Sequence, residues 1–228
     1  MNRVTAITTA GLALTLGVAL TGCSSATKTE ATTTTSSSAP APSSPVAVAN
    51  KTIKDYLAEN QIVQTPMHAG DPGAPVLTLP ELPGWSDLSA EQTTVAGGVP
   101  PYAAKGFDAA SGGERPVIQV RLAKLTGNAD FQQLLDLAPA DAQNAPGFAF
   151  VTQPGPTTLG GFDGVAFSGT LPQDGQTFVT ASRFIVIPDA DPSTTYFVRL
   201  NGTAPESAQS VLMDAMGIVD TGTTIQPG

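Results

Sequence analysis

Residues 164–201 read GVAFSGTLPQDGQTFVTASRFIVIPDADPSTTYFVRLN, and they carry the main signal for the fold class. It holds three apolar segments rich in β-branched and aromatic residues, at 164–171, 177–188 and 195–201. Such segments are typical of strands. Residues 173–176 contain Asp-Gly, which supplies the positive φ angles of a tight hairpin turn. Because short turns join antiparallel neighbours, we expect an antiparallel sheet at the centre of the domain.

Further strands are predicted on either side of this stretch. Residues 116–125, PVIQVRLAKL, alternate over their whole length, with Ile118 and Val120 on one face and Gln119 and Arg121 on the other. This pattern indicates a strand with one buried face. Shorter strands are predicted at 76–80 and 148–152.

Three helices are predicted from caps and from apolar positions at helical spacing. Residues 52–60 form the first, where Thr52 and Asp55 have the spacing of a capping box. Residues 128–142 form the second, with Asn128 as the cap. The third begins at Pro205 and brings an apolar stripe to one face. The predicted fold class is therefore α+β, a central antiparallel sheet flanked by helices in a sandwich.

The first 22 residues have the character of a lipoprotein signal peptide. Their apolar run, residues 10–20, is too short to cross roughly 30 Å of hydrocarbon. It ends in Leu-Thr-Gly before Cys23, which matches a bacterial lipobox, where the cysteine thiol is acylated and the peptide bond before it is then cut. Cys23 is the one cysteine of the 228 residues, so no internal disulfide can form. We expect acyl chains on Cys23 to anchor an exported protein to the outer face of the cell membrane.

A tether separates this anchor from the domain. Residues 23–49 consist mainly of Ser, Thr, Ala and Pro, which cannot bury enough apolar surface to offset the entropy of ordering. As a flexible coil this stretch would reach about 25 to 30 Å. The remaining residues, 50–228, are predicted to form a single domain.

The charge of this domain excludes two classes of partner. Of the chain's ten Lys and Arg, Arg3 and Lys28 precede the domain, and one of the 19 acidic residues does, so the domain carries 8 − 18 = −10. An acidic domain without a basic stripe does not displace counterions from nucleic acid. Nor does its charge favour anionic lipid head groups, so attachment to the membrane rests on the acyl anchor.

The chemistry-bearing residues give no catalytic or metal centre. His68, the one histidine, precedes Asp71 by three residues in the loop TPMHAGDPGAP. A hydrolase would also need a nucleophile and oxyanion donors, and no GxSxG motif occurs. One histidine and scattered carboxylates do not make a transition-metal site. We therefore expect no enzyme and no cofactor, and we interpret the His68–Asp71 loop as a surface connection or as a contact for a ligand or partner.

Aromatic residues supply the other candidate contacts. Trp85 follows a Pro-Gly turn, and phenylalanines concentrate in the second half of the domain, among them Phe150 and Phe167. Their strands can line a cavity between the sheet and a helix, or they can form ordinary core. The sequence leaves both alternatives open.

Several motifs in this order resemble the LpqN/LpqT family of mycobacterial lipoproteins: TIKDYLAENQIVQTPMHAGDPGAP, AKLTG, NAPGF, TLGGF, FIVIP and VLMDAMGIVD. The resemblance spans the lipobox, the tether and nearly all of the domain. It implies a PsbP-like fold and a cell-envelope protein of binding or accessory type. Apart from the lipobox cysteine, Cys23, it transfers no functional residue.

Two functions fit these constraints. The first is a non-catalytic binding module that handles envelope lipids or glycolipids, such as trehalose mycolates, for envelope transport or acyltransferase proteins. The alternative is a protein–protein interaction module that docks envelope or host proteins without a small ligand. The two differ in whether the phenylalanine strands enclose an open cavity.

Overall fold

The computed structural model describes residues 50–88, 101–108 and 114–228 of the chain. The predicted signal peptide, Cys23 and the tether lie outside these described residues. The described strands are β1 (Val63–Met67), β2 (Val76–Thr78), β3 (Trp85–Asp87), β4 (Ala103–Phe107), β5 (Val117–Thr126), β6 (Ala149–Leu159), β7 (Phe162–Gln173), β8 (Gln176–Pro188), β9 (Thr194–Pro205) and β10 (Thr224–Gln226).

Eight of these strands form one sheet with the order β3-β4-β5-β9-β8-β7-β6, in which β1 also pairs with β5. Every pairing is antiparallel. The turn between β7 and β8 places Asp174 and Gly175 at φ 50° and 77°, which confirms the predicted Asp-Gly hairpin. Strands β2 and β10 form a separate two-stranded ladder.

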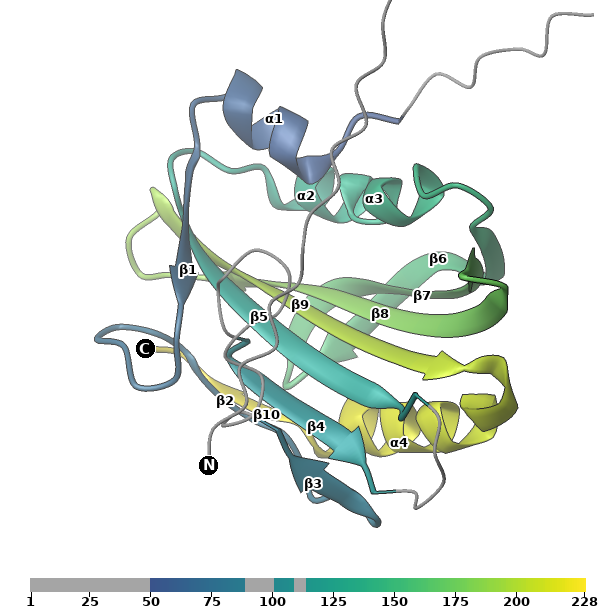
Figure 1. Cartoon of the computed structure of the whole chain (residues 1–228). Helices are drawn as coiled ribbons and strands as arrows, with labels where there is room; N and C mark the ends of the chain where they lie inside the picture. Colours follow the sequence, from purple (N-terminus) through teal and green to yellow (C-terminus); the bar gives the residue numbers. More distant parts are fainter. Residues whose placement is uncertain (1–49, 89–100, 109–113) are drawn as a thin grey trace, which may run out of the picture. The chain divides into compact units, whose positions relative to one another are not determined.

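Helices cover both faces of this sheet (Figure 1). Helices α1 (Ile53–Glu59), α2 (Phe131–Leu137) and α3 (Ala140–Gln143) lie on one side, and α4 (Gln209–Gly222) lies on the other. This arrangement confirms the α+β fold class, a central antiparallel sheet flanked by helices. We call the two sides of the sheet the α1–α3 face and the α4 face.

Two details of the predicted helices are wrong. The predicted helix 128–142 is two helices, because Pro139 has no N–H to donate and interrupts the ladder between α2 and α3. Its cap is Asp130 rather than Asn128, and the Asp130 carboxylate accepts a hydrogen bond from Gln133 N–H at 2.9 Å. Pro205 ends β9 instead of starting the last helix, and a 3₁₀ turn, Glu206–Ala208, leads into α4.

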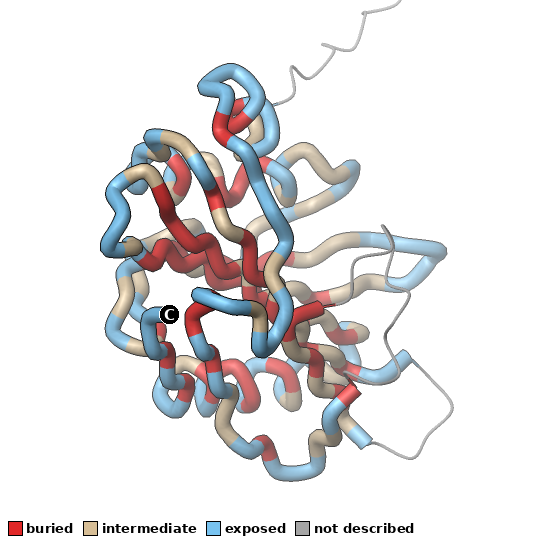
Figure 2. Tube along the Cα trace, turned by 90° about the vertical axis from the view of Figure 1, so that its left-hand side faces the viewer, coloured by how far each residue is buried: buried red, intermediate tan, exposed pale blue. Residues whose placement is uncertain are grey.

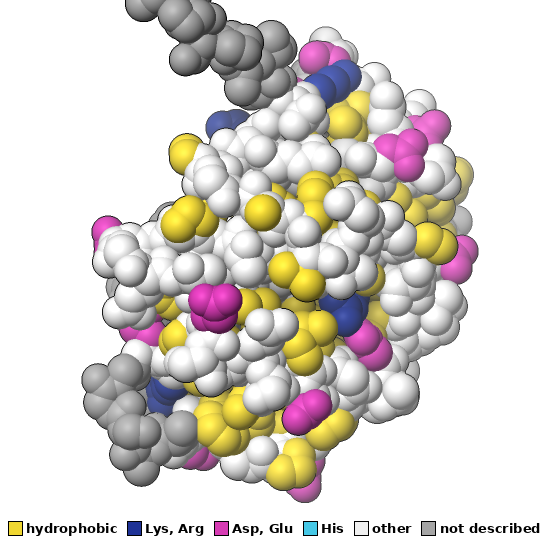
Figure 3. Space-filling view, turned by 90° about the vertical axis from the view of Figure 1, so that its right-hand side faces the viewer, with side chains coloured by type: hydrophobic (Ala, Val, Ile, Leu, Met, Phe, Trp, Pro, Cys, Tyr) yellow, Lys and Arg dark blue, Asp and Glu magenta, His cyan; other side chains and the backbone are white. Residues whose placement is uncertain are grey.

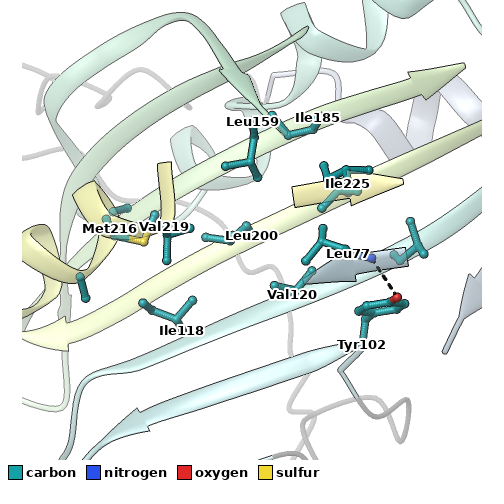
Figure 4. Packing of buried hydrophobic residues seen from close by; sticks show 14 of the residues in the cluster. Leu77, Tyr102, Ile118, Val120, Leu159, Ile185, Leu200, Met216, Val219 and Ile225 are labelled. Atoms are coloured by element: carbon teal, nitrogen blue, oxygen red, sulfur yellow. Dashed lines mark hydrogen bonds between the residues drawn. The ribbon is translucent and has the colours of Figure 1, made fainter. Parts of the chain in front are cut away.

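The structure also contains strands that the sequence pattern did not predict. The short strands β1, β3, β4 and β10 were not predicted, and β2 pairs with β10 rather than joining the main sheet. Tyr102 holds β2 in place, because its hydroxyl accepts a hydrogen bond from Leu77 N–H at 3.2 Å and donates one to Pro75 O (Figure 4).

The core divides into one cluster on each side of the sheet. Along β9, Val198 and Leu200 belong to the cluster under α4, whereas Phe197 belongs to the cluster under α1 and α2. This alternation is the two-residue period of a strand. Buried residues run through the central strands, and exposed residues follow the loops around them (Figure 2).

Candidate ligand-binding site

Two adjoining cavities lie on the α1–α3 face. The first has a volume of about 260 Å³ and the second about 280 Å³. Helix α1 and strands β1, β5 and β9 line the first, and α3 with β7, β8 and β9 lines the second. Three residues line both cavities: Asp141, Phe184 and Arg199. Either volume alone lies just below the range of about 300–1,000 Å³ usual for ligand pockets, and the two together lie within it.

The first cavity opens where two strands share one edge of β5. Strand β4 pairs with β5 up to Val120, and β1 pairs with it from Leu122 onward. Because β9 occupies the opposite edge along the whole of β5, β1 and β4 must follow one another on the same side. Arg121 sits at the junction between them, and its side chain lines the cavity.

Arg121 and Arg199 are the paired cations of the first cavity. They are directly opposite each other in the β5–β9 register and face the same cavity. The Arg199 guanidinium lies 5.3 Å from the centre of the Phe184 ring, a cation–π distance. On its other side the Nη1 atom is 3.6 Å from an Asp141 carboxylate oxygen. This separation allows an ion pair but exceeds normal hydrogen-bond length.

The surroundings of Arg199 perturb its ionisation. Desolvation by the cavity walls lowers the pKa of Arg199, Asp141 acts in the opposite direction, and the nearby charge of Arg121 lowers it further. Arginine remains protonated despite such shifts. The result is a charged group that has given up part of its hydration and has an acidic partner within reach.

The rest of the first cavity is mainly apolar. Its walls include Ile53 and Leu57 of α1, Leu125 of β5 and Phe197 of β9. Lys54 and Gln64 add polar atoms at α1 and β1. An apolar enclosure with a few convergent polar groups is the usual composition of a small-molecule site.

The second cavity combines aromatic walls with a polar floor. Ser182 donates to Asn201 Oδ1 at 2.7 Å, and Asn201 donates to Thr203 Oγ1 at 3.1 Å. All three residues line the cavity beside Phe148, Phe167, Phe178 and Phe184. Aromatic contacts continue along this face with ring centroids 5.0 to 5.8 Å apart, through Phe148, Phe150, Phe167, Phe184 and Phe197.

Comparisons with known proteins identify the family to which this chain belongs. The family model described as "Probable lipoprotein LpqN" matches residues 49–226. The chain belongs to the LpqN family. It is 34% identical over 178 residues to "Lipoprotein LpqN" of Mycobacterium tuberculosis (strain ATCC 25618 / H37Rv). This match covers 78% of this chain and 75% of that protein. The predicted family resemblance is thereby confirmed.

A solved structure of the LpqN family matches the fold as well. The crystal structure of "LpqN involved in cell envelope biogenesis of Mycobacterium tuberculosis" superimposes with a TM-score of 0.70 at 34% identity. The match covers 78% of this chain and 99% of that chain. All residues of both core clusters lie between Tyr56 and Ile225. Because the match covers 99% of the solved LpqN chain, we propose that the region from Asn50 to Gly228 folds by itself.

In this member of the LpqN family the predicted contact residues fall in three separate places. His68 and Asp71 follow β1 in an exposed loop and line neither cavity. Asp71 accepts a hydrogen bond from the His68 backbone N–H at 2.7 Å, and its oxygen is 3.5 Å from the imidazole Nδ1. Asp71 N–H donates to His68 O in return, at 3.2 Å. These bonds make the segment an ordered turn.

Trp85 lies on the other side of the sheet from the cavities. It packs against the core under α4 and contacts Phe107 with ring centroids 5.7 Å apart. Both aromatic residues line a surface hollow of about 310 Å³ beside α4, together with Val211 and Ile218. Trp85 thus belongs to a different surface from the two cavities.

Phe150 and Phe167 are the predicted residues that the structure brings together. Their rings meet edge to face, with centroids 5.7 Å apart. Phe167 is buried and lines the second cavity, and Phe150 packs behind it. The phenylalanine strands therefore form core and cavity wall at once, so the two alternatives left open by the sequence are both realised.

Arg121, Arg199 and Asp141 were not predicted as site residues. A signal existed for the two arginines, because each is a cation on the second face of an otherwise apolar alternating strand. That the two arginines lie opposite each other depends on how β5 pairs with β9 in the folded sheet.

Among the described residues, no group of three or more His, Cys, Asp or Glu side chains is placed to hold a metal ion. No helix in that part of the chain is long and apolar enough to cross a membrane.

Proposed function

We propose that the domain is a non-catalytic binding module for an amphiphile of the cell envelope, a lipid or a glycolipid. The observation that carries this proposal is the pair of cavities that meet at Asp141, Phe184 and Arg199. Their apolar walls suit acyl chains, and the hydroxyl and amide groups of Ser182, Asn201 and Thr203 suit a polar head group.

The setting supports this proposal. The solved LpqN is described as involved in cell envelope biogenesis. We infer that acylated Cys23 holds this protein at the outer face of the membrane, with residues 23–49 as the tether. Trehalose mycolates are cargo of the proposed class, and an exporter or an acyltransferase of the envelope would receive them.

Native mass spectrometry tests the proposal. The domain Asn50–Gly228 is produced alone, mixed with a total envelope lipid extract and sprayed under conditions that preserve a known lipid complex. We expect a discrete added mass that is released as one lipid class. A protein that stays free of added mass would contradict the proposal.

A matched pair of variants locates the bound molecule. Ala123→Phe places a large side chain into the first cavity, where Ala123 is buried in the wall. Ala58→Phe makes the same change on the exposed side of α1 and serves as the control. We expect uptake to be lost in the first variant and kept in the second. Equal uptake by both would place the lipid elsewhere.

A second candidate is a module that docks envelope or host proteins without a small ligand. Hydrophobic side chains reach the surface at the lower end of the face in Figure 3. The hollow lined by Trp85, Phe107, Val211 and Ile218 supplies apolar surface beside α4, and Met213 and Ile218 are 37% and 38% exposed. Crosslinking on intact cells tests it: Ile218→Asp removes captured proteins if this surface docks them and leaves them unchanged if it does not.

A further inference from the structure

Several cations of this acidic domain lie together at the first cavity. The domain carries eight Lys and Arg against 18 Asp and Glu. Three of the eight cations, Lys54, Arg121 and Arg199, line the first cavity. Among the residues that the structure describes, one acidic residue, Asp141, lines it with them. The described lining of the cavity therefore carries more positive than negative charge, inside a domain whose net charge is −10, and this local charge favours an anion.

Arg121 and Arg199 also lie directly opposite each other in the sheet. Like charges directly opposite each other on neighbouring strands destabilise a sheet, and Arg121 and Arg199 occupy one such pair on β5 and β9. An anion between the two guanidinium groups would interact favourably with both. The planar guanidinium fork matches the oxygens of phosphate and carboxylate groups.

The Asp141 carboxylate, which lies next to Arg199, forms only a weak ion pair with it. Its oxygen is 3.6 Å from Arg199 Nη1, and the two side chains are 50% and 42% exposed. Exposed ion pairs of this kind contribute little to stability. An incoming anion can therefore replace the Asp141 carboxylate at Arg199 without a large loss of protein stability.

We propose that the first cavity binds an amphiphile with an anionic head group, a phosphate or a carboxylate, held between Arg121 and Arg199. The apolar body of the ligand lies against Ile53, Leu57, Leu125 and Phe197. This inference rests on the proposed function and narrows it, because it requires an anionic group on the ligand, which the uncharged trehalose mycolates lack.

Calorimetric titration of the domain Asn50–Gly228 with three twelve-carbon probes, each below its micellar concentration, tests the inference. Dodecyl phosphate and dodecanoate carry the two candidate anions, and dodecyl maltoside carries the same chain with a neutral head group. We expect at least one anionic probe to bind about tenfold or more tightly than the neutral one, the size of effect that charged hydrogen bonds give. The tighter of the two anionic probes identifies phosphate or carboxylate as the preferred group.

Three substitutions assign the effect to the arginine pair. Arg121→Gln and Arg199→Gln should each abolish the preference for the anion and leave binding of dodecyl maltoside in place. Arg115→Gln makes the same change at an exposed arginine that lines neither cavity, and should keep the preference. Thermal unfolding of each variant verifies that the fold is retained.

The outcomes separate this inference from the proposed function. Equal binding of all three probes would overturn the anionic site and leave a neutral lipid site standing. A preference that survives both glutamine variants would overturn it as well. If none of the probes binds and the lipid extract adds no mass, the proposed function itself is wrong.

Discussion

The two faces of the sheet each carry an arginine on a central strand that reaches an aspartate on a helix, and the two pairs differ in kind. On the α4 face, Arg183 of β8 binds Asp220 of α4 through two hydrogen bonds of 2.9 and 2.8 Å, and the Arg183 side chain is 10% exposed. On the α1–α3 face, Arg199 of β9 is 3.6 Å from Asp141 of α3, and both side chains are about half exposed.

The packing around the two arginine–aspartate pairs also differs, being tight on the α4 face and open on the α1–α3 face. Under α4, Leu212, Met216 and Val219 are fully buried, and Figure 4 shows Met216 and Val219 packed toward Leu200 of the sheet. The sheet approaches so closely that a Cβ on Gly202 would lie 2.7 Å from Leu212 Cδ1. Under α1 and α3 the packing leaves the two cavities open. One face therefore stabilises the fold by filling space, and we propose that the other keeps space and charge available for a ligand.

Truncation of one leucine on each face should give the largest difference. Leu212→Ala opens a new cavity in a filled core, which costs about 3 to 5 kcal/mol of unfolding free energy. Leu57→Ala removes a side chain that already borders the first cavity, and should cost about 2 kcal/mol or less. Urea denaturation of both variants measures the two values. Equal losses would show that the α1–α3 face is packed as tightly as the α4 face.

Removal of each aspartate gives the next effect in size. Asp220→Ala leaves the largely buried Arg183 without its two charged hydrogen bonds, and should cost about 2 kcal/mol. Asp141→Ala breaks an exposed pair and should change stability by less than about 0.5 kcal/mol. The same denaturation curves report both. A large loss for Asp141→Ala would mean that this pair holds the fold together and is not available for exchange.

The α4 face was largely predictable from the sequence, because its information is local. The alternation of β5 predicted a buried face, and Ile118 and Val120 are buried. The apolar stripe predicted for the last helix was Val211, Leu212, Ala215 and Met216, of which the last three are buried and Val211 is half-buried. The Asp-Gly turn likewise determined how β7 and β8 pair. Such features depend on residues within one element or one hairpin.

The candidate site was not predictable in the same way. Arg121 and Arg199 are 78 positions apart, and they face each other only through the register of β5 with β9. The opening beside Arg121 depends on β1, a five-residue strand largely exposed to solvent that carries no buried alternating pattern. The one histidine attracted attention by its chemistry, yet its loop lies apart from both cavities. The pairing register of two strands that are far apart in the sequence cannot be read from either strand alone.

The helices on the two faces should also respond differently to loss of a cap. Helix α1 has seven residues and a complete capping box between Thr52 and Asp55, whereas the fourteen-residue α4 has no side-chain cap bond. We therefore expect Thr52→Ala to cost about 1 kcal/mol and to increase hydrogen exchange in α1. An exchange pattern unchanged in α1 would show that packing alone holds this helix.

Acid should weaken the same cap. Hydrogen bonds from the Thr52 backbone N–H and hydroxyl hold the pKa of Asp55 below its ordinary value. A lowered pKa stabilises the fold above the ordinary value of 3.8, and this contribution is lost as the pH falls through the lowered pKa. The protection factors of the α1 amides, which remove the pH dependence of intrinsic exchange, should thus fall below about pH 4 in the unsubstituted domain, and Thr52→Ala should remove part of that dependence.

The smallest expected effect is the most specific one. Asp141→Asn removes the carboxylate that competes for Arg199 while keeping the shape of the side chain. The affinity for the preferred anionic probe should rise about threefold, in keeping with an exposed ion pair worth under 1 kcal/mol. Asp136→Asn, on the exposed side of α2, makes the same change in net charge and should leave the affinity unchanged.

A lower affinity in Asp141→Asn would mean that this carboxylate contacts the ligand instead of being displaced by it from Arg199. A rise in affinity confined to this variant, and absent with dodecyl maltoside, ties the anion to Arg199, because only a competitor for that guanidinium is removed.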